Sequence, residues 1–238
     1  MNYWLVMPAA GAGSRFGADV PKQYLELRGR TVLERALAPF IADPRCQGIA
    51  LALAAADPQR SRLAASLPAK VRLATGGALR SDSVLAGLAA LPAATDDWVL
   101  VHDAARPLLS PRDLDALLAA GEQPQLPGAL LAEAVADTLK RADAAGYSAA
   151  TQERAALWRA QTPQMFRHGA LRAALQAAQR EGRQPTDEAQ AMEWQGVHAL
   201  LVAAQDPNFK ITTRADLHLA AALLTSQSGA DPAGGDSA

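Results

Sequence analysis

Short apolar segments alternate with amphipathic helical patterns along most of the chain, and this alternation limits the possible folds more than any other feature. Parallel strands joined by helices produce this order, because each strand needs a crossover before the next parallel strand can begin. The apolar segments predict strands at residues 3–8, 48–54, 71–74, 98–102, 128–132 and 197–202. The sequence therefore predicts an α/β fold with a mainly parallel sheet.

Helix-start signals follow several of these segments. Thr31 and Glu34 have the spacing of a capping box, and Ser110 precedes a proline, as an N-cap residue often does. Asp57 also precedes a proline and predicts another N-cap. Further helices are expected after an Asp82 cap and from about residues 167, 186 and 213.

The chain has 238 residues and shows no internal linker long enough to divide it. We therefore expect a single domain over about residues 1–225, large enough to form its own core. Residues 226–238 are mostly Ser, Gly, Asp, Pro and Ala, and we expect a disordered tail there. No second catalytic domain is expected after residue 225.

Charge and cysteine content argue against several classes of protein. The 23 Lys and Arg residues against 24 Asp and Glu residues give a net charge of −1, and no basic stripe carries interleaved aromatic residues, so nucleic-acid binding is not expected. No run of about 18 apolar residues occurs, so neither membrane insertion nor export is expected. Cys46 is the only cysteine, which excludes an intrachain disulfide and a thiolate zinc site. We expect a cytoplasmic protein.

Residues 136–158 depart from the alternating pattern. Residues 138–141 and 148–153 have little helical periodicity and flank an Asp-Ala-Ala-Gly turn, which predicts a protruding two-stranded β-ribbon arm. A two-stranded ribbon is marginally stable alone, so we expect it to pack against something, with a second subunit as one candidate.

A glycine-rich loop follows the first expected strand. Gly11 and Gly13 let backbone N–H groups approach a phosphate, while Arg15 and Lys22 add positive charge. The dinucleotide-binding fingerprint fails because Phe16 stands where glycine or alanine is needed, and the P-loop motif is absent. An ordinary strand-to-helix turn is the alternative, but the two cations favour a triphosphate site.

Two further polar loops follow expected strands, at residues 76–83 and 103–106. Because the carboxyl ends of parallel strands meet at one edge of a sheet, all three loops are expected to form one site. Asp103 is placed to bind Mg²⁺ or ligand hydroxyls. The simpler alternatives are a glycine turn, a capping hydroxyl at Ser83 and a turn-capping carboxylate at Asp103.

The histidines do not indicate a hydrolytic triad. His102 and Asp103 are adjacent, so in an extended chain they point to opposite sides, and no serine lies in a G-x-S-x-G elbow. His168, His198 and His218 fit helix or strand surfaces.

The remaining evidence lies in the order of short motifs. They are PAAGxGxR at residues 8–15, PKQ at 21–23, GGxxRxxSV at 76–84 and VHDAARP at 101–107. Further matching segments lie at residues 137–138, 161–164, 186–188 and 210–212. Each motif is weak alone, but together, up to about residue 224, they resemble the 2-C-methyl-D-erythritol 4-phosphate cytidylyltransferases.

This resemblance implies transfer of a cytidylyl group from CTP to methylerythritol phosphate, with release of pyrophosphate, in the non-mevalonate route to isoprenoid precursors. It implies a three-layer, Rossmann-like nucleotidyltransferase fold with Mg²⁺ as cofactor. It also implies a homodimer in which the ribbon arm of one subunit wraps around the other.

The resemblance also implies roles for particular residues. Arg15 and Lys22 correspond to the cations on the triphosphate and the transition state. The nucleotide contacts correspond to Ala9, Ala10, Gly11, Gly77 and Ser83. The sugar phosphate is implied to contact Asp103, Arg106, Thr138, Arg154, Thr162 and Lys210. Arg154 and Lys210 are counted with the catalytic cations, and Arg106, Thr138 and Arg154 are implied to reach in from the other subunit.

Without the resemblance, Arg154 would be a solvated charge and Lys210 a charge at the end of a strand. Ala78 stands where the family often has an acidic residue, so one of the family's nucleotide contacts is not implied here.

The implied reaction needs no general base, because a phosphate monoester with a second pKa of about 6 is already anionic near neutral pH. It needs fixed cations and a divalent metal to bring two anions together. Three other functions stay open at this point. They are a ribitol-5-phosphate cytidylyltransferase, a nucleotide-binding module without catalysis and, with less support, an NAD-dependent oxidoreductase.

Overall fold

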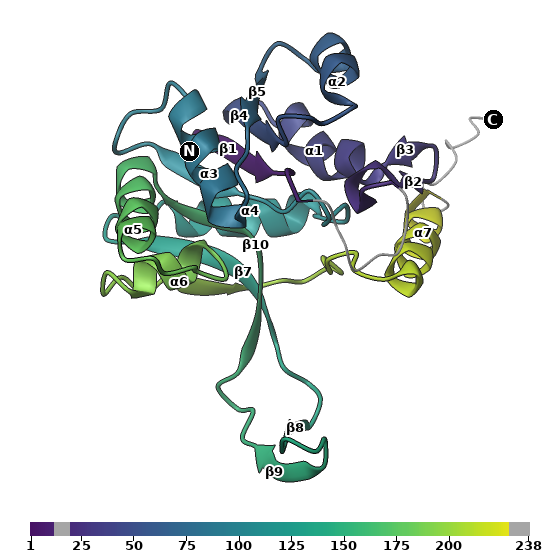
Figure 1. Cartoon of the computed structure of the whole chain (residues 1–238), viewed down its shortest axis with the longest axis vertical. Helices are drawn as coiled ribbons and strands as arrows, with labels where there is room; N and C mark the ends of the chain where they lie inside the picture. The colour runs from purple at the N-terminus through teal and green to yellow at the C-terminus, as the bar shows by residue number, and fades with distance from the viewer. Residues whose placement is uncertain (12–19, 229–238) are drawn as a thin grey trace, which may run out of the picture.

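The computed structural model describes residues 1–11 and 20–228, with side chains described up to Thr225. In this part of the chain a seven-stranded sheet has the order β11-β7-β10-β6-β1-β4-β5. Figure 1 labels β1, β4, β5, β7 and β10 of this sheet. Its strands are β1 (Tyr3–Pro8), β4 (Cys46–Leu53), β5 (Val71–Thr75), β6 (Trp98–Val101), β7 (Gly128–Ala134), β10 (Trp158–Arg167) and β11 (Leu200–Ala203). Only β10 runs antiparallel to its neighbours, so the predicted mainly parallel sheet is confirmed.

Strand β10 is the strand of this sheet that the sequence pattern does not predict. It lies between β6 and β7, yet Gln161, Thr162 and Gln164 are 5%, 4% and 1% exposed. A central strand normally appears as an apolar run, and these polar residues with Pro163 interrupt that pattern. Two of these buried side chains have partners outside the sheet, because Thr162 accepts from the Asp103 N–H and Gln164 bonds to Asp187 and Ala189.

Helices cover both faces of the sheet. They are α1 (Val32–Ala42), α2 (Arg60–Ser66), α3 (Arg80–Ala90), α4 (Pro111–Ala120), α5 (His168–Arg180) and α6 (Glu188–Glu193). One core joins α1 and α4 to Leu5 and Met7, and a second joins α3, α5 and α6 to Val6. Because neighbouring strand residues point to opposite faces, β1 contributes to both cores and lies in the middle of three layers.

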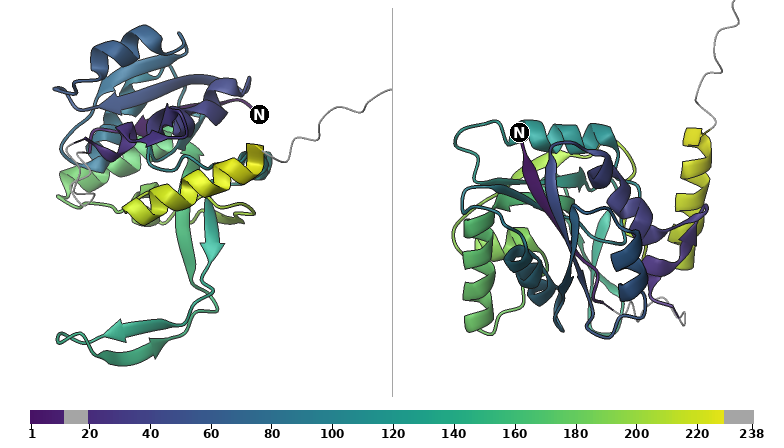
Figure 2. Two further views of the ribbon diagram at one scale, coloured as in Figure 1. Left: turned by 90° about the vertical axis from the view of Figure 1, so that its right-hand side faces the viewer. Right: turned by 90° about the horizontal axis from the view of Figure 1, so that it is seen from above.

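A small separate core lies at the side of the sheet, where α7 (Arg214–Ser228) covers β2 (Glu26–Leu27) and β3 (Arg30–Thr31) (Figure 2). Leu27, Val32, Leu108, Ile211 and Ala220 form this core. It joins the segment after the first glycine-rich loop to the segment before α7. Since α7 continues to Ser228, it extends into the expected tail, whose residues from 229 lie outside the described part of the chain.

Two of the predicted helix caps are confirmed. The Glu34 N–H donates to Thr31 Oγ1 at 3.1 Å while Thr31 N–H donates to Glu34 Oε2 at 2.7 Å, and Ser110 Oγ accepts from Asp113 N–H at 3.1 Å.

Two other predicted caps are wrong. Helix α2 begins at Arg60, so Asp57 lies before its N-cap and instead accepts hydrogen bonds from Gln59 N–H and Tyr24 Oη. Asp82 lies inside the first turn of α3, where it accepts from Leu79 N–H. Both helices start at residues that lack the usual capping side chains.

The segment between β7 and β10 leaves the sheet and carries a separate antiparallel pair, β8 (Leu139–Ala142) and β9 (Ser148–Gln152) (Figures 1 and 2). Residues 140–156 are all exposed, and Tyr147 at the turn is 74% exposed. Among the helices of the described residues, none has both the length and the apolar character needed to cross a membrane.

Candidate active site

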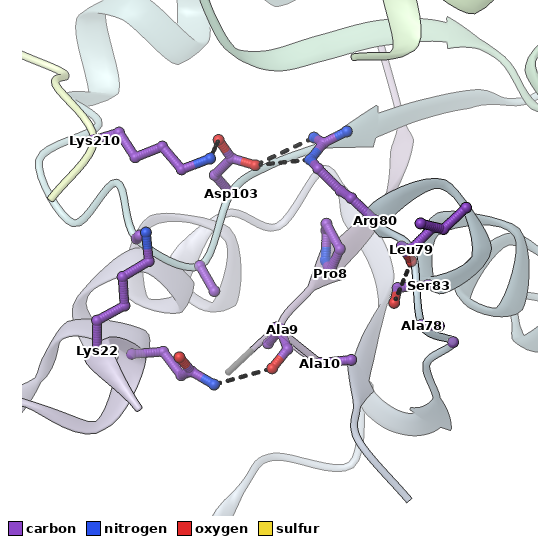
Figure 3. A pocket seen from close by; sticks show the side chains of 15 residues that line it. Pro8, Ala9, Ala10, Lys22, Ala78, Leu79, Arg80, Ser83, Asp103 and Lys210 are labelled. Atoms are coloured by element: carbon purple, nitrogen blue, oxygen red, sulfur yellow. Dashed lines mark hydrogen bonds and ion pairs between the residues drawn. The ribbon is translucent and has the colours of Figure 1, made fainter. Parts of the chain in front are cut away.

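A cavity of about 240 Å³ lies at the carboxyl ends of β1, β5 and β6 (Figure 3). Its lining brings together the described part of the first loop, the paired-glycine loop and the loop after β6. The predicted site residues that line it are Ala9, Ala10, Gly11, Lys22, Gly77, Ser83, Asp103 and Lys210. Ala78 also lines it, whereas Arg15 lies outside the described residues.

Lys22 is held at this cavity by a short 3₁₀ helix, η2 (Lys22–Tyr24). The buried Gln23 side chain donates to the Ala9 carbonyl at 3.0 Å, which joins η2 to the end of β1. Lys22 Nζ donates to the Ile211 carbonyl at 3.2 Å, one residue from Lys210. Two predicted cations from distant parts of the sequence therefore lie on the same side of the cavity.

Gly76 lets the paired-glycine loop approach the first loop. A Cβ at this position would lie 2.6 Å from Ala10 Cβ and 2.7 Å from Ser83 Oγ, closer than real side chains come. Ser83 is 2% exposed, and its hydroxyl donates to the Leu79 carbonyl at 3.2 Å. The glycine here thus serves close packing between the two expected nucleotide loops.

Asp103 is surrounded by three cations. Its Oδ1 lies 3.2 Å from Arg80 Nη2, and its Oδ2 lies 3.0 Å from Lys210 Nζ and 3.5 Å from Arg106 Nε. Burial by itself would raise the pKa of this carboxyl, but Arg80, Lys210 and Arg106 hold it well below its usual range. Asp103 is therefore ionised and fixes the three cations around one point.

The same contacts test whether Asp103 fits a metal ion. Mg²⁺ prefers an octahedral set of oxygen ligands, but both oxygens of Asp103 already face cations. Among the described residues, no group of three or more His, Cys, Asp or Glu side chains is placed to hold a metal. The expected role of Asp103 as a metal ligand does not fit this arrangement.

Thr162 lies beneath Asp103 and does not line the cavity. Its Oγ1 accepts from the Asp103 N–H at 3.0 Å and lies 3.0 Å from Nδ1 of His102, whose Nε2 lies 3.0 Å from the Arg106 carbonyl. A carbonyl only accepts, so Nε2 carries the proton and Nδ1 accepts from the Thr162 hydroxyl. Burial lowers the pKa of His102 to about 4, which keeps the ring neutral. The geometry favours a role for Thr162 in positioning Asp103.

Several other residues lie elsewhere in the structure than the sequence predicts. Arg106 contacts Asp103 of its own chain and donates to the Asn208 carbonyl at 2.8 Å, so its expected arrival from another subunit is corrected. Thr138 and Arg154 are exposed, on the segment that leaves the sheet, and do not line the cavity. His168 is buried instead of exposed, with Nε2 lying 3.1 Å from the Leu88 carbonyl.

Among the described charged residues that line the cavity, Arg80 is the one without a role predicted from the sequence. It begins α3, directly after the paired-glycine loop, and contacts both Asp103 and the buried Glu188. A cation at the first helical position of such a loop is a signal that sequence reasoning could have used. The contact with Glu188, which lies 108 positions away, could not have been inferred from spacing.

The family model for 2-C-methyl-D-erythritol 4-phosphate cytidylyltransferase matches residues 3–226. The chain belongs to this family. A protein of that name from Ectopseudomonas mendocina (strain ymp) is 51% identical over 219 residues, which are 91% of this chain and 93% of the relative. One from Pseudomonas aeruginosa (strain UCBPP-PA14) is 51% identical over 219 residues, 90% of this chain and 93% of the relative.

Solved structures of the cytidylyltransferase family have the same fold. A crystal structure of 4-diphosphocytidyl-2C-methyl-D-erythritol synthase matches with a TM-score of 0.81 and 37% identity, over 94% of this chain and 98% of the other. The Francisella tularensis 2-C-methyl-D-erythritol 4-phosphate cytidylyltransferase matches with a TM-score of 0.79 and 33% identity, over 92% of this chain and 98% of that chain. The predicted nucleotidyltransferase fold is thus confirmed.

The position of Thr162 gives a testable prediction. Thr162→Val keeps the shape of the side chain but leaves the buried Asp103 N–H and His102 Nδ1 without their partner, which should lower the free energy of unfolding by about 1–3 kcal/mol. Thr162→Ser keeps the hydroxyl and should retain most of the stability. Urea unfolding of both variants measures the difference, and equal stability of the Val and Ser variants would contradict the hydrogen-bonding scheme.

Proposed function

We infer that this protein transfers a cytidylyl group from CTP to 2-C-methyl-D-erythritol 4-phosphate and releases pyrophosphate. The observation that carries this proposal is the family match over residues 3–226, which covers every side chain at the cavity. The two loops expected to bind the nucleotide meet the cation cluster around Asp103 in that cavity. This arrangement suits a reaction between two phosphate groups.

In the proposed reaction an anionic phosphate oxygen of the sugar phosphate attacks the α-phosphorus of CTP. One P–O bond forms, and the bond from the α-phosphorus to the bridging oxygen of the β-phosphate breaks, so that pyrophosphate leaves with the electron pair. The attacking oxygen carries its charge near neutral pH and needs no base. The barrier lies in the accumulation of negative charge, which preorganised cations lower.

Lys22 and Lys210 are placed for this task. Lys210 is 38% exposed, so its ammonium can contact a ligand while it pairs with Asp103. Lys22 approaches from the first loop and is held through the Ile211 carbonyl. We propose that Lys22 stabilises charge on the triphosphate, a role that the resemblance also implies for Arg15, and that Lys210 holds the sugar phosphate.

We propose that CTP enters with Mg²⁺, as the family resemblance implies, and that Asp103 organises the cations without coordinating the metal. We also propose a cytoplasmic location. Cys46 is a buried free thiol, which suits a reducing compartment. The names of the relatives above support methylerythritol phosphate over ribitol phosphate as the acceptor.

A pyrophosphate-release assay tests the proposed function. ATP, GTP, UTP and CTP are each combined with methylerythritol phosphate and with ribitol 5-phosphate. We expect rapid release only with CTP and methylerythritol phosphate, because these are the substrates that the names of the relatives imply. Faster release with ribitol 5-phosphate would show that ribitol 5-phosphate, not methylerythritol phosphate, is the acceptor. No release with CTP and either sugar phosphate would overturn the proposal.

We further propose a homodimer in which the arm at residues 136–158 completes the partner's site. The paired strands β8 and β9 bury little against their own sheet, and a ribbon of two strands is marginally stable alone. Thr138 and Arg154 lie on this arm and away from the cavity of their own chain. A role in holding the sugar phosphate therefore requires the arm to reach another subunit.

Mixed dimers test this arrangement. Lys22→Ala and Arg154→Ala should each be nearly inactive alone, but after mixing and subunit exchange one site of each mixed dimer has both residues intact. Random pairing should restore about a quarter of the wild-type activity, since half of the dimers are mixed. Unmixed samples are the control, and no recovery despite exchange would show that Arg154 does not act across the interface.

A further inference from the structure

The guanidinium of Arg80 lies where the two halves of the cavity meet. Arg80 is the first residue of α3, which follows the expected nucleotide loop, and its Nε donates to Asp103 Oδ1 at 3.2 Å (Figure 3). Its side chain is 28% exposed and lines the cavity. Arg80 thus connects the nucleotide loop with the cation cluster expected to hold the sugar phosphate.

Glu188 holds this guanidinium in place. Its side chain is 1% exposed, and its two oxygens accept from Arg80 Nη1 at 2.6 Å and Nη2 at 3.0 Å. A bidentate pair of this kind fixes both the position and the plane of the arginine. Burial opposes the charge on Arg80, but Glu188 and Asp103 outweigh it and raise the pKa of the guanidinium.

Glu188 is itself firmly placed by the start of α6 and by β10. Asp187 caps α6 by accepting from Gln190 N–H at 2.9 Å. Gln164 of β10 accepts from Ala189 N–H at 2.8 Å and donates to Asp187 Oδ2 at 2.9 Å. Polar side chains of the central strand therefore fix the helix that carries Glu188.

We propose that Glu188 is a positioning residue that aims Arg80 at the point where the phosphates of the two substrates meet. This inference rests on the proposed function. Without the Glu188 carboxylate, the guanidinium of Arg80 would turn toward Asp103, the remaining anion beside it. It would then compete with Lys210 for the Asp103 carboxylate. A displaced cation near the reacting groups lowers the rate even when both substrates still bind.

Asp43→Asn is the matched control for Glu188→Gln. Asp43 is also buried and paired with an arginine, Arg45, at 2.9 Å. It contacts Tyr3, at the amino end of β1 and so at the edge of the sheet opposite the cavity. Both substitutions remove the charge of a buried carboxylate that is paired with a partly exposed arginine, so their effects on stability should be similar in kind.

The test measures kcat and KM for both substrates, well below the melting temperature of each variant. We expect Glu188→Gln to lower kcat about 10²-fold with smaller changes in either KM, and Asp43→Asn to leave both parameters near wild type. Arg80→Lys keeps the positive charge but loses the planar guanidinium that pairs with both oxygens of Glu188, and it should show the same loss of kcat. The double variant Glu188→Gln/Arg80→Lys should have a kcat no lower than that of either single variant, because the two residues act as one unit.

Three results would overturn the inference. They are a kcat of Glu188→Gln within twofold of that of Asp43→Asn, an Arg80→Lys variant with normal kcat, or losses that multiply in the double variant. If Glu188→Gln does not fold, a normal kcat of Arg80→Lys would still overturn the inference. Failure of the proposed function is separate, since it would appear as inactivity of the wild-type enzyme with CTP and methylerythritol phosphate.

Discussion

The ionised carboxylate of Asp103 is the group on which the rest of the site depends. Arg80 comes from α3, Arg106 from the loop after β6 and Lys210 from the segment before α7, and these three cations would repel one another without it. Because the pKa of Asp103 is lower in the folded chain than in the unfolded chain, its ionisation contributes stability above about pH 4, which is lost as the pH falls further. The same charge that organises the cations thus stabilises the fold.

Two supports hold this cluster in place. The buried residues of β10 bond to the loop after β6 and to α6, so one polar strand fixes both Asp103 and Glu188. The small core beneath α7 contains Ile211, whose carbonyl accepts from Lys22 and whose neighbour is Lys210. Buried polar side chains of β10 therefore position Asp103 and Glu188. The small apolar core beside the sheet positions Lys22 and Lys210.

Much of this arrangement follows from the sequence because it depends on local patterns. Apolar runs predict β1, β4, β5, β6, β7 and β11, and their parallel order brings the loops after β1, β5 and β6 to one edge. What the sequence does not predict depends on distant partners. Thr162 and Gln164 interrupt the pattern of a buried strand, and the pairing of Arg80 with Glu188 joins residues 108 positions apart. The arm's place in a dimer stays a prediction for the same reason.

The ionisation of Asp103 can be measured directly by a ¹³C NMR titration of aspartate-labelled protein, with the Asp103 carboxyl signal assigned from the Asp103→Asn variant. Three neighbouring cations should keep this carboxyl ionised, so its chemical shift should stay constant from pH 7 to the lowest pH at which the protein remains folded. A titration midpoint near the ordinary aspartate value of about 4 would show that the cations do not surround an ionised Asp103 and would contradict this account of the site.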